Sequence, residues 1–198
     1  MTEKKKGRAA IRERMLSLRD GIPEKERAAM SQRIESHLFS LPVLAAARNI
    51  MFYVAFRSEV ETRSAMYQCL ALGKSLVLPV TLAREKRLIP YLVTNLDQEL
   101  RPGYCSIPEP DPSRTVEFDS RELDVIILPG SSFDHNGGRL GYGGGFYDRF
   151  LAITAPRAVR IGLAFSCQIT NELSLAPHDQ PINYLVTELG AEKCHYHR

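Results

Sequence analysis

The strongest constraint on the fold is an uninterrupted apolar run, Val125-Ile126-Ile127-Leu128. A run without polar positions is typical of a strand that is buried on both faces at the centre of a parallel sheet. From Asn49 onward, short apolar runs alternate with stretches of helical spacing. This alternation predicts an α/β fold with a mainly parallel sheet flanked by helices. Ligands of such sheets bind beyond the carboxyl ends of the strands, so the loops after Phe56 and Leu128 are candidate site segments.

The spacing of apolar residues, together with the positions of glycines and prolines, predicts the individual helices and strands. Residues 1–48 are expected to be helical, and residues 94–122, which contain several prolines, are expected to be an irregular loop. The expected helices are Lys5–Leu18, Pro23 to just before Pro42, Thr62–Gly73 and Gly145–Ile153, and the expected strands are Ile50–Phe56, Ser75–Val80, Leu88–Val93, Val125–Leu128, Val159–Phe165 and Tyr184–Thr187.

Length and composition favour one globular domain. The chain has 198 residues, of which 44% are apolar and 25% charged, with a formal net charge of +3. A chain of this size buries about 70% of its unfolded surface, which is enough for one core. We therefore expect a single domain over residues 1–198, with the helical segment of about 1–48 packed on an α/β core, and a monomer in solution.

Two classes of protein are excluded at this stage. The apolar runs are far shorter than the roughly 18 residues that a membrane span requires. The segment Met1-Thr2-Glu3-Lys4-Lys5-Lys6 leads into further charge and not into the apolar stretch of a signal peptide. We expect a soluble cytoplasmic protein without membrane or nucleic-acid partners.

The four cysteines form no C-x-x-C pair, so we expect reduced, mostly buried thiols and no zinc site.

The chemistry is concentrated around a glycine cluster. Seven of the 13 glycines lie between Gly130 and Gly145, and Arg139 and Arg149 bracket the densest part. Clustered glycines leave backbone N–H groups uncovered and allow left-handed conformations, which together build an anion-binding nest. A helix is expected to begin just beyond, with its own unpaired N–H groups. The segment therefore suits a polyphosphate, although a flexible surface turn is the simpler alternative.

The common phosphate-binding motifs do not fit this segment. A dinucleotide fingerprint beginning at Gly141 has Phe146 where it requires glycine, and a P-loop has Gly144-Gly145 where it requires Lys-Ser/Thr. Asp148 either caps the following helix or holds Mg²⁺ beside a bound triphosphate. Asp179 is either a turn residue or a second carboxylate of the same site.

The glycine motif resembles the signature of the 5-formyltetrahydrofolate cyclo-ligase family. The resemblance rests on Phe133-Asp134 and Gly138-Arg139-Leu140-Gly141-Tyr142-Gly143-Gly144-Gly145-Phe146-Tyr147-Asp148-Arg149, and it extends to the Ser58–Thr62 loop and the Pro177–Glu188 segment. It implies a three-layer fold similar to that of sugar-phosphate isomerases and CoA-transferases. It also implies conversion of 5-formyltetrahydrofolate to 5,10-methenyltetrahydrofolate with ATP and Mg²⁺, releasing ADP and phosphate.

The resemblance also assigns site residues. No side chain is assigned as a nucleophile or base, and the resemblance places Mg²⁺ at Asp148 and Asp179. The implied ATP contacts are Arg8, Arg12, Arg139, Leu140, Gly141, Tyr142, Gly143, Gly144, Gly145, Phe146 and Tyr147. The implied folate contacts are Phe56, Glu61, Tyr142, Gly143, Gly144, Gly145 and Phe146.

Some alternatives stay open. Taken alone, Glu61 is a charge at a helix start and Phe56 is a core residue. The fold likeness allows a non-catalytic module that binds a phosphosugar or a nucleotide. The basic segment Lys4-Lys5-Lys6-Gly7-Arg8 allows a nucleic-acid arm, which the small net charge disfavours.

Overall fold

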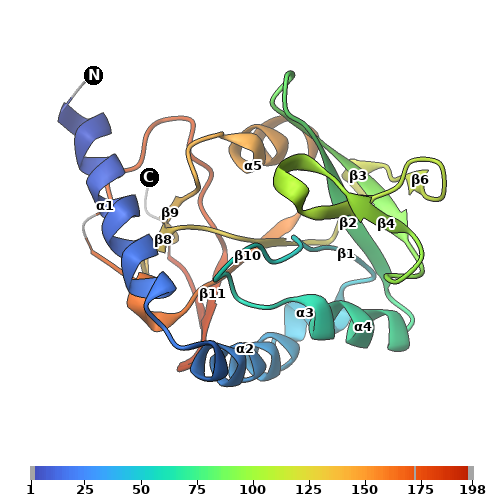
Figure 1. The fold of residues 1–198 in the computed structure, drawn as a ribbon, viewed down its shortest axis with the longest axis horizontal. Coiled ribbons are helices and arrows are strands. Elements are labelled where there is room, and N and C mark those ends of the chain that lie inside the picture. Colours follow the sequence, from blue (N-terminus) through green and yellow to red (C-terminus); the bar gives the residue numbers. More distant parts are fainter. Residues whose placement is uncertain (1–2, 172, 196–198) are drawn as a thin grey trace.

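A mixed sheet forms the centre of the molecule. The computed structural model describes residues 3–171 and 173–195. Five neighbouring strands run parallel, and antiparallel strands extend the sheet at both edges (Figure 1). Among the described residues the sheet has eight strands, in the order β12 (Gly190–Lys193), β11 (Tyr184–Thr187), β10 (Val159–Leu163), β7 (Val125–Leu128), β1 (Asn49–Met51), β2 (Ser75–Leu82), β3 (Arg87–Val93) and β6 (Val116–Glu117).

Helices cover both faces of this sheet, as the sequence predicts. On β7, Val125 and Ile127 belong to one core cluster and Ile126 and Leu128 to the other, because successive side chains of a strand point to opposite faces. The first cluster includes α2 (Glu24–Phe39), α3 (Pro42–Ala46) and α4 (Arg63–Ala71). The second includes a π-helical turn, 150–154, that continues α5 (Phe146–Arg149). Burying each of these apolar side chains contributes roughly 1.5–3 kcal/mol.

The first helix lies at the side of the sheet that carries the glycine motif. α1 (Glu3–Asp20) packs against the short 3₁₀ turn after β10 and against β8 (Ser132–Phe133), which pairs with β9 (Arg139–Leu140) (Figure 1). Its inward side carries Arg8, Arg12, Met15 and Arg19, which recur at the spacing of one helix face. Met15 and Arg19 are buried, and Arg8 and Arg12 are half-buried.

Several expected elements have different bounds. The strand expected at Ile50–Phe56 ends at Met51, because the following segment turns away and forms its own hydrogen bonds: Thr62 Oγ1 donates to Tyr53 O, and Tyr53 OH to Val60 O. The expected strand at Val159–Phe165 ends at Leu163. Pro42, expected to follow a helix, begins α3, where its missing N–H is not needed.

The segment 94–122 is more regular than expected. It holds a hairpin of β4 (Leu100–Pro102) and β5 (Pro108–Pro110), the edge strand β6, and two 3₁₀ turns. The helix expected at Gly145–Ile153 is split into α5 and the π-helical turn. Sequence patterns do not predict the short strands within 94–122 or the π-helical turn, because such elements depend on partners elsewhere in the chain.

None of the helices among the described residues is long and apolar enough to cross a membrane. All four cysteines are free; Cys69 and Cys194 are buried, Cys167 is half-buried and Cys105 is exposed, so fewer thiols are buried than the sequence led us to expect.

Candidate active site

The loops that follow β1, β7 and β10 meet at the carboxyl edge of the parallel strands. Gln168, in the turn after β10, donates from Nε2 to the carbonyls of Gly130 and Ser131 after β7, at 2.9 and 3.1 Å. Tyr142, further along the second loop, donates its hydroxyl to Glu59 in the loop after β1. The two loops singled out from the sequence are therefore in direct contact.

A tight turn between β8 and β9 sets the path of the glycine motif. Asp134 Oδ1 accepts hydrogen bonds from the amides of Asn136 and Gly138, at 2.9 and 2.7 Å. Gly137 has a φ of +90°, and a Cβ on Gly138 would lie 2.2 Å from the Asp134 carboxylate. Glycine is required at both positions, since one has a left-handed backbone and the other has no room for a side chain.

The segment Gly141–Gly145, here called the glycine loop, exposes its backbone N–H groups. Gly143 and Gly145 have φ values of +97° and +65°. Arginines hold two of the carbonyls: Arg12 Nε donates to Gly141 O at 2.8 Å, and Arg149 Nη2 to Gly144 O at 2.6 Å. Within the described part of the chain, the amides of residues 142–145 have no hydrogen-bond partner. Unpaired amides on such a loop are suited to binding an anion.

The two aspartates expected to bind metal lie on neighbouring segments, and each is paired with an arginine. Asp148 Oδ1 accepts from Arg139 Nη2 at 2.8 Å and from the amide of Gln180 at 3.1 Å. Asp179 receives both terminal nitrogens of Arg8, at 2.6 and 3.0 Å. The structure thus brings together Arg8, Arg139, Asp148 and Asp179 from distant parts of the sequence.

Burial and the proximity of these charged groups shift the pKa values of Asp179 and Arg12. Burial opposes ionisation of Asp179, but the hydrogen bonds from Arg8 and from the amide of Ala176 outweigh it and hold the pKa of this carboxyl below its usual value. Burial and the neighbouring Arg8 lower the pKa of Arg12, although it still carries a positive charge. The positive charges of Arg8 and Arg12 therefore act on the same part of the site, where they favour an anionic ligand.

A second network links α1 to the glycine loop. The buried Arg19 donates from Nη1 to the Tyr142 hydroxyl at 2.7 Å and from Nε to Ser58 Oγ at 2.9 Å. The Tyr142 hydroxyl donates in turn to the buried carboxylate of Glu59, which also accepts from the amide of Phe56 at 2.9 Å. Sequence reasoning did not single out Arg19 or Glu59. The available signal was that Arg19 shares the helix face of the apolar Met15.

Comparisons with known proteins agree on one family. The family model described as 5-formyltetrahydrofolate cyclo-ligase matches residues 4–188. This chain belongs to that family of enzymes. The 5-formyltetrahydrofolate cyclo-ligase of Escherichia coli (strain K12) is 30% identical over 178 residues, covering 89% of this chain and 96% of the relative. The cyclo-ligase of Haemophilus influenzae is 28% identical over 176 residues, covering 88% and 94%.

Solved structures extend the family likeness to the fold. The structure of Aquifex aeolicus 5,10-methenyltetrahydrofolate synthetase matches with a TM-score of 0.84 and 29% identity, covering 96% of this chain and 94% of that one. The agreement spans the sheet and the segments that carry the candidate site. The cyclo-ligase fold is therefore present nearly throughout the chain.

The residues expected on the folate side of the cyclo-ligase site lie in different surroundings. Phe56 is half-buried, with the guanidinium of Arg57 4.9 Å from its ring centre. Glu61 is exposed, and its carboxylate accepts from the amides of Thr62 and Arg63, both at 2.9 Å, where α4 begins. The structure does not bring Glu61 to the glycine loop. It brings Glu59, two residues earlier, which is buried and accepts a hydrogen bond from Tyr142.

The β4–β5 hairpin also reaches the site. The ring of Tyr104 lies 6.1 Å from that of Phe146, at an interplanar angle of 50°. Phe146 directly follows the glycine loop, packs against the second core cluster, and has the Arg149 guanidinium 5.8 Å from its ring centre. A segment expected to be irregular thus contacts, through Tyr104, the residue next to the glycine loop.

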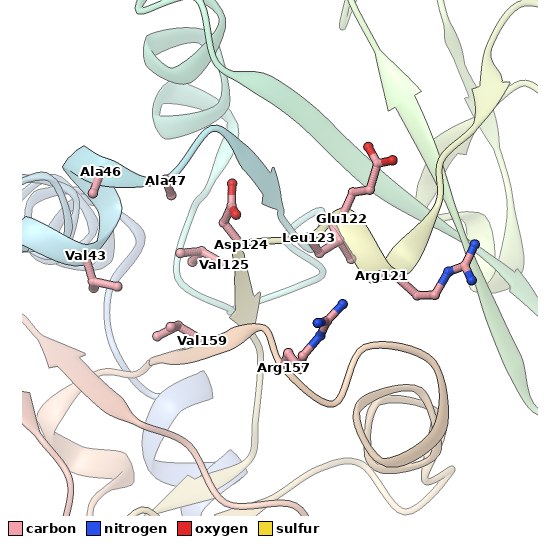
Figure 2. A pocket seen from close by; sticks show the side chains of 10 residues that line it. All are labelled: Val43, Ala46, Ala47, Arg121, Glu122, Leu123, Asp124, Val125, Arg157 and Val159. Atoms are coloured by element: carbon pink, nitrogen blue, oxygen red, sulfur yellow. The ribbon is translucent and has the colours of Figure 1, made fainter.

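A pocket of about 430 Å³ lies at the opposite edge of the sheet. Figure 2 shows its lining: Asp124 precedes β7, Val159 begins β10, and Val43 and Ala46 come from α3. These are the amino ends of the parallel strands. Because α/β sheets bind ligands at the carboxyl ends, we place the active site at the glycine loop and not in this pocket.

Proposed function

We propose that this enzyme converts 5-formyltetrahydrofolate to 5,10-methenyltetrahydrofolate in a reaction that consumes ATP, requires Mg²⁺, and releases ADP and phosphate. The observation that carries the proposal is the glycine loop of a cyclo-ligase family member, whose unpaired amides adjoin a cluster of arginines and aspartates. Unpaired amides and guanidinium groups are suited to phosphate oxygens. The ATP-side residues are those named from the sequence, from Arg8 and Arg12 to the segment 139–147.

The chemistry explains why ATP is needed. A formyl amide has a weakly electrophilic carbon, and its oxygen does not leave as oxide. Transfer of the γ-phosphoryl group to that oxygen creates a phosphate leaving group, and attack of N10 on the same carbon then closes the ring. The protein has to align two substrates and neutralise phosphate charge, so no side-chain nucleophile is required.

The carboxylates of Asp148 and Asp179 fit Mg²⁺. They are oxygen donors on neighbouring segments, and Mg²⁺ is typically held by one or two carboxylates together with phosphate oxygens and waters. The described residues contain no cluster of three or more His, Cys, Asp or Glu side chains. The metal would supply charge neutralisation at the transferred phosphate.

On the folate side we propose Phe56, Tyr142, Gly143, Gly144, Gly145 and Phe146 as the wall of the pocket. We also propose Glu61, which the resemblance names, as the acidic residue on the folate side. Its exposed carboxylate uses one oxygen at the start of α4, whereas both oxygens of the buried Glu59 carboxylate accept hydrogen bonds within the protein.

We further propose a single domain, a monomer and a cytoplasmic location, without membrane or nucleic-acid partners. A likeness of the fold to sugar-phosphate isomerases and CoA-transferases stays a prediction.

The direct test follows the near-ultraviolet absorbance of the methenyl product in a mixture of enzyme, 5-formyltetrahydrofolate, ATP and Mg²⁺. We expect growth of the signal that stops when ATP is omitted or the metal is chelated. ATP binding without product would favour a nucleotide-binding module with another second substrate. Salt-sensitive retention on DNA without turnover would favour a nucleic-acid function.

A further inference from the structure

We propose that Arg19 is a positioning residue, which fixes the glycine loop through the hydroxyl of Tyr142. The kinetic part of this inference rests on the proposed function, whereas its structural part does not. Arg19 lies near the carboxyl end of α1, more than a hundred residues from the loop in the sequence.

The glycine loop offers only one side chain to hold. Of its five residues, four are glycines, and Tyr142 alone carries a side chain. Glycines at Gly143 and Gly145 adopt left-handed backbone conformations and add little stiffness of their own. The carbonyls of Gly141, Gly144 and Gly145 accept hydrogen bonds from Arg12 and Arg149, and Tyr142 supplies the side-chain anchor of this stretch.

The hydroxyl of Tyr142 is held from two sides. It accepts from Arg19 and donates to Glu59, which uses both functions of a neutral phenol. Burial and the nearby Glu59 raise the pKa of Tyr142 well above its usual value, so the hydroxyl keeps its proton. Tyr142 nevertheless remains 49% exposed, so its ring is accessible while its hydroxyl is fixed.

The burial of Arg19 supports this role. Only 3% of its surface is exposed, and burying a guanidinium is unfavourable unless its N–H groups are paired. Its second hydrogen bond goes to Ser58, in the loop that also carries Glu59. Arg19 therefore ties the loop after β1 and the glycine loop to the same point on α1, and so sets the distance between the two walls of the proposed site.

The test compares Arg19→Met, Tyr142→Phe and the double variant with the wild-type protein. Arg19→Met preserves most of the volume and the helix preference, and Tyr142→Phe removes a single oxygen. A matched control is Arg33→Met, because Arg33 is an exposed arginine on α2. Arg19→Lys tests whether a positive charge alone restores the wild-type behaviour, since lysine keeps the charge but lacks the planar, bidentate geometry of a guanidinium.

The first readout is the backbone N–H order parameter of residues 141–145 from ¹⁵N relaxation, which requires no activity. We expect values of about 0.85, typical of rigid backbone, in the wild-type protein and values below about 0.6 in both single variants, with little further decrease in the double variant, partial recovery in Arg19→Lys and no change in Arg33→Met. Unchanged order parameters in Tyr142→Phe, or fully additive effects, would overturn the proposal.

The second readout separates positioning from a merely structural role. We expect the KM for both ATP and the folate to rise several-fold, with a smaller change in kcat, because a mobile loop weakens both binding walls. A fall in kcat with unchanged KM values would indicate loss of folded enzyme and would contradict the inference. If the wild-type protein forms no methenyl product, the proposed function fails, while the relaxation experiment still decides the role of Arg19.

Discussion

Glu59 and Asp179 are both buried carboxyl groups at the candidate site, yet their pKa values shift in opposite directions. Burial raises the pKa of Glu59, and the hydrogen bonds from Tyr142 and Phe56 only partly offset it. Burial also raises the pKa of Asp179, but the bidentate contact with Arg8 contributes to a larger lowering, so the pKa lies below its usual value. The difference arises because a direct arginine partner stabilises the charged form far more than a neutral hydroxyl does.

The raised pKa of Glu59 predicts a pH-dependent loss of stability. Above the ordinary glutamate value of 4.5, the unfolded chain releases a proton that the folded protein retains, so wild-type stability falls as the pH rises through the raised pKa. Glu59→Gln keeps a hydrogen-bond acceptor without the charge. We expect its stability relative to wild type to increase by about 1.4 kcal/mol for each pH unit of the shift. Urea unfolding across this pH range measures the difference, and parallel pH profiles would contradict it.

Asp148 requires a more careful substitution than alanine. Asp148→Ala would leave Arg139, which is 2% exposed, without its carboxylate partner, and breaking a buried pair on one side costs about 3–5 kcal/mol. Asp148→Asn retains an oxygen for Arg139 and for the Gln180 amide. We expect this variant to fold, as judged by circular dichroism, and to lose Mg²⁺-dependent turnover by more than the roughly 10–100-fold typical of an outer-shell change. Turnover close to that of wild type would remove Asp148 from the metal site.

At the scale of the elements, two glycines have opposite effects. A Cβ on Gly162, in β10, would lie 2.6 Å from the buried ring of Phe133 and 2.8 Å from Ile182. A Cβ on Gly7, in α1, would meet nothing within 4 Å. The first glycine is required for packing between strand and ring, and the second only weakens its helix.

Alanine at these two positions is therefore a matched pair. We expect Gly162→Ala to lower the free energy of unfolding by about 1–3 kcal/mol through overpacking. Gly7→Ala is expected to raise it by up to about 1 kcal/mol, since alanine is the better helix former. Chemical denaturation of both variants under one set of conditions tests the assignment, and effects of the same sign would refute it.

At the scale of the whole molecule, the candidate site joins α1, the loop after β1, the glycine loop and the turn at Asp179. A ligand that contacts all of them stabilises the fold as a unit. At a ligand concentration of 100 times Kd the gain is about 2.7 kcal/mol. For a domain of this size, that corresponds to a rise in Tm of about 5–10 °C.

We expect ATP with Mg²⁺ to produce this rise in wild type and a much smaller one in Asp148→Asn. Differential scanning calorimetry also tests the single-domain expectation, because one cooperative transition requires the calorimetric and van't Hoff enthalpies to agree. Two resolved transitions, or an equal shift in the variant, would contradict these expectations.

The sequence by itself determined the α/β class, the family and the phosphate-suited glycine motif, because hydrophobic periodicity and glycine spacing are local properties of the chain. It did not determine the end of β1 or the hairpin within 94–122, which depend on hydrogen bonds to distant segments. The family resemblance named Glu61 and did not single out Glu59. The two share a loop, and only the packing of α1 and the glycine loop turns one carboxylate inward and leaves the other at the start of α4. The pairing of Arg8 with Asp179 and of Arg19 with Tyr142 was likewise decided by the tertiary structure alone, since residues this far apart in the chain meet only once the sheet and its helices are assembled.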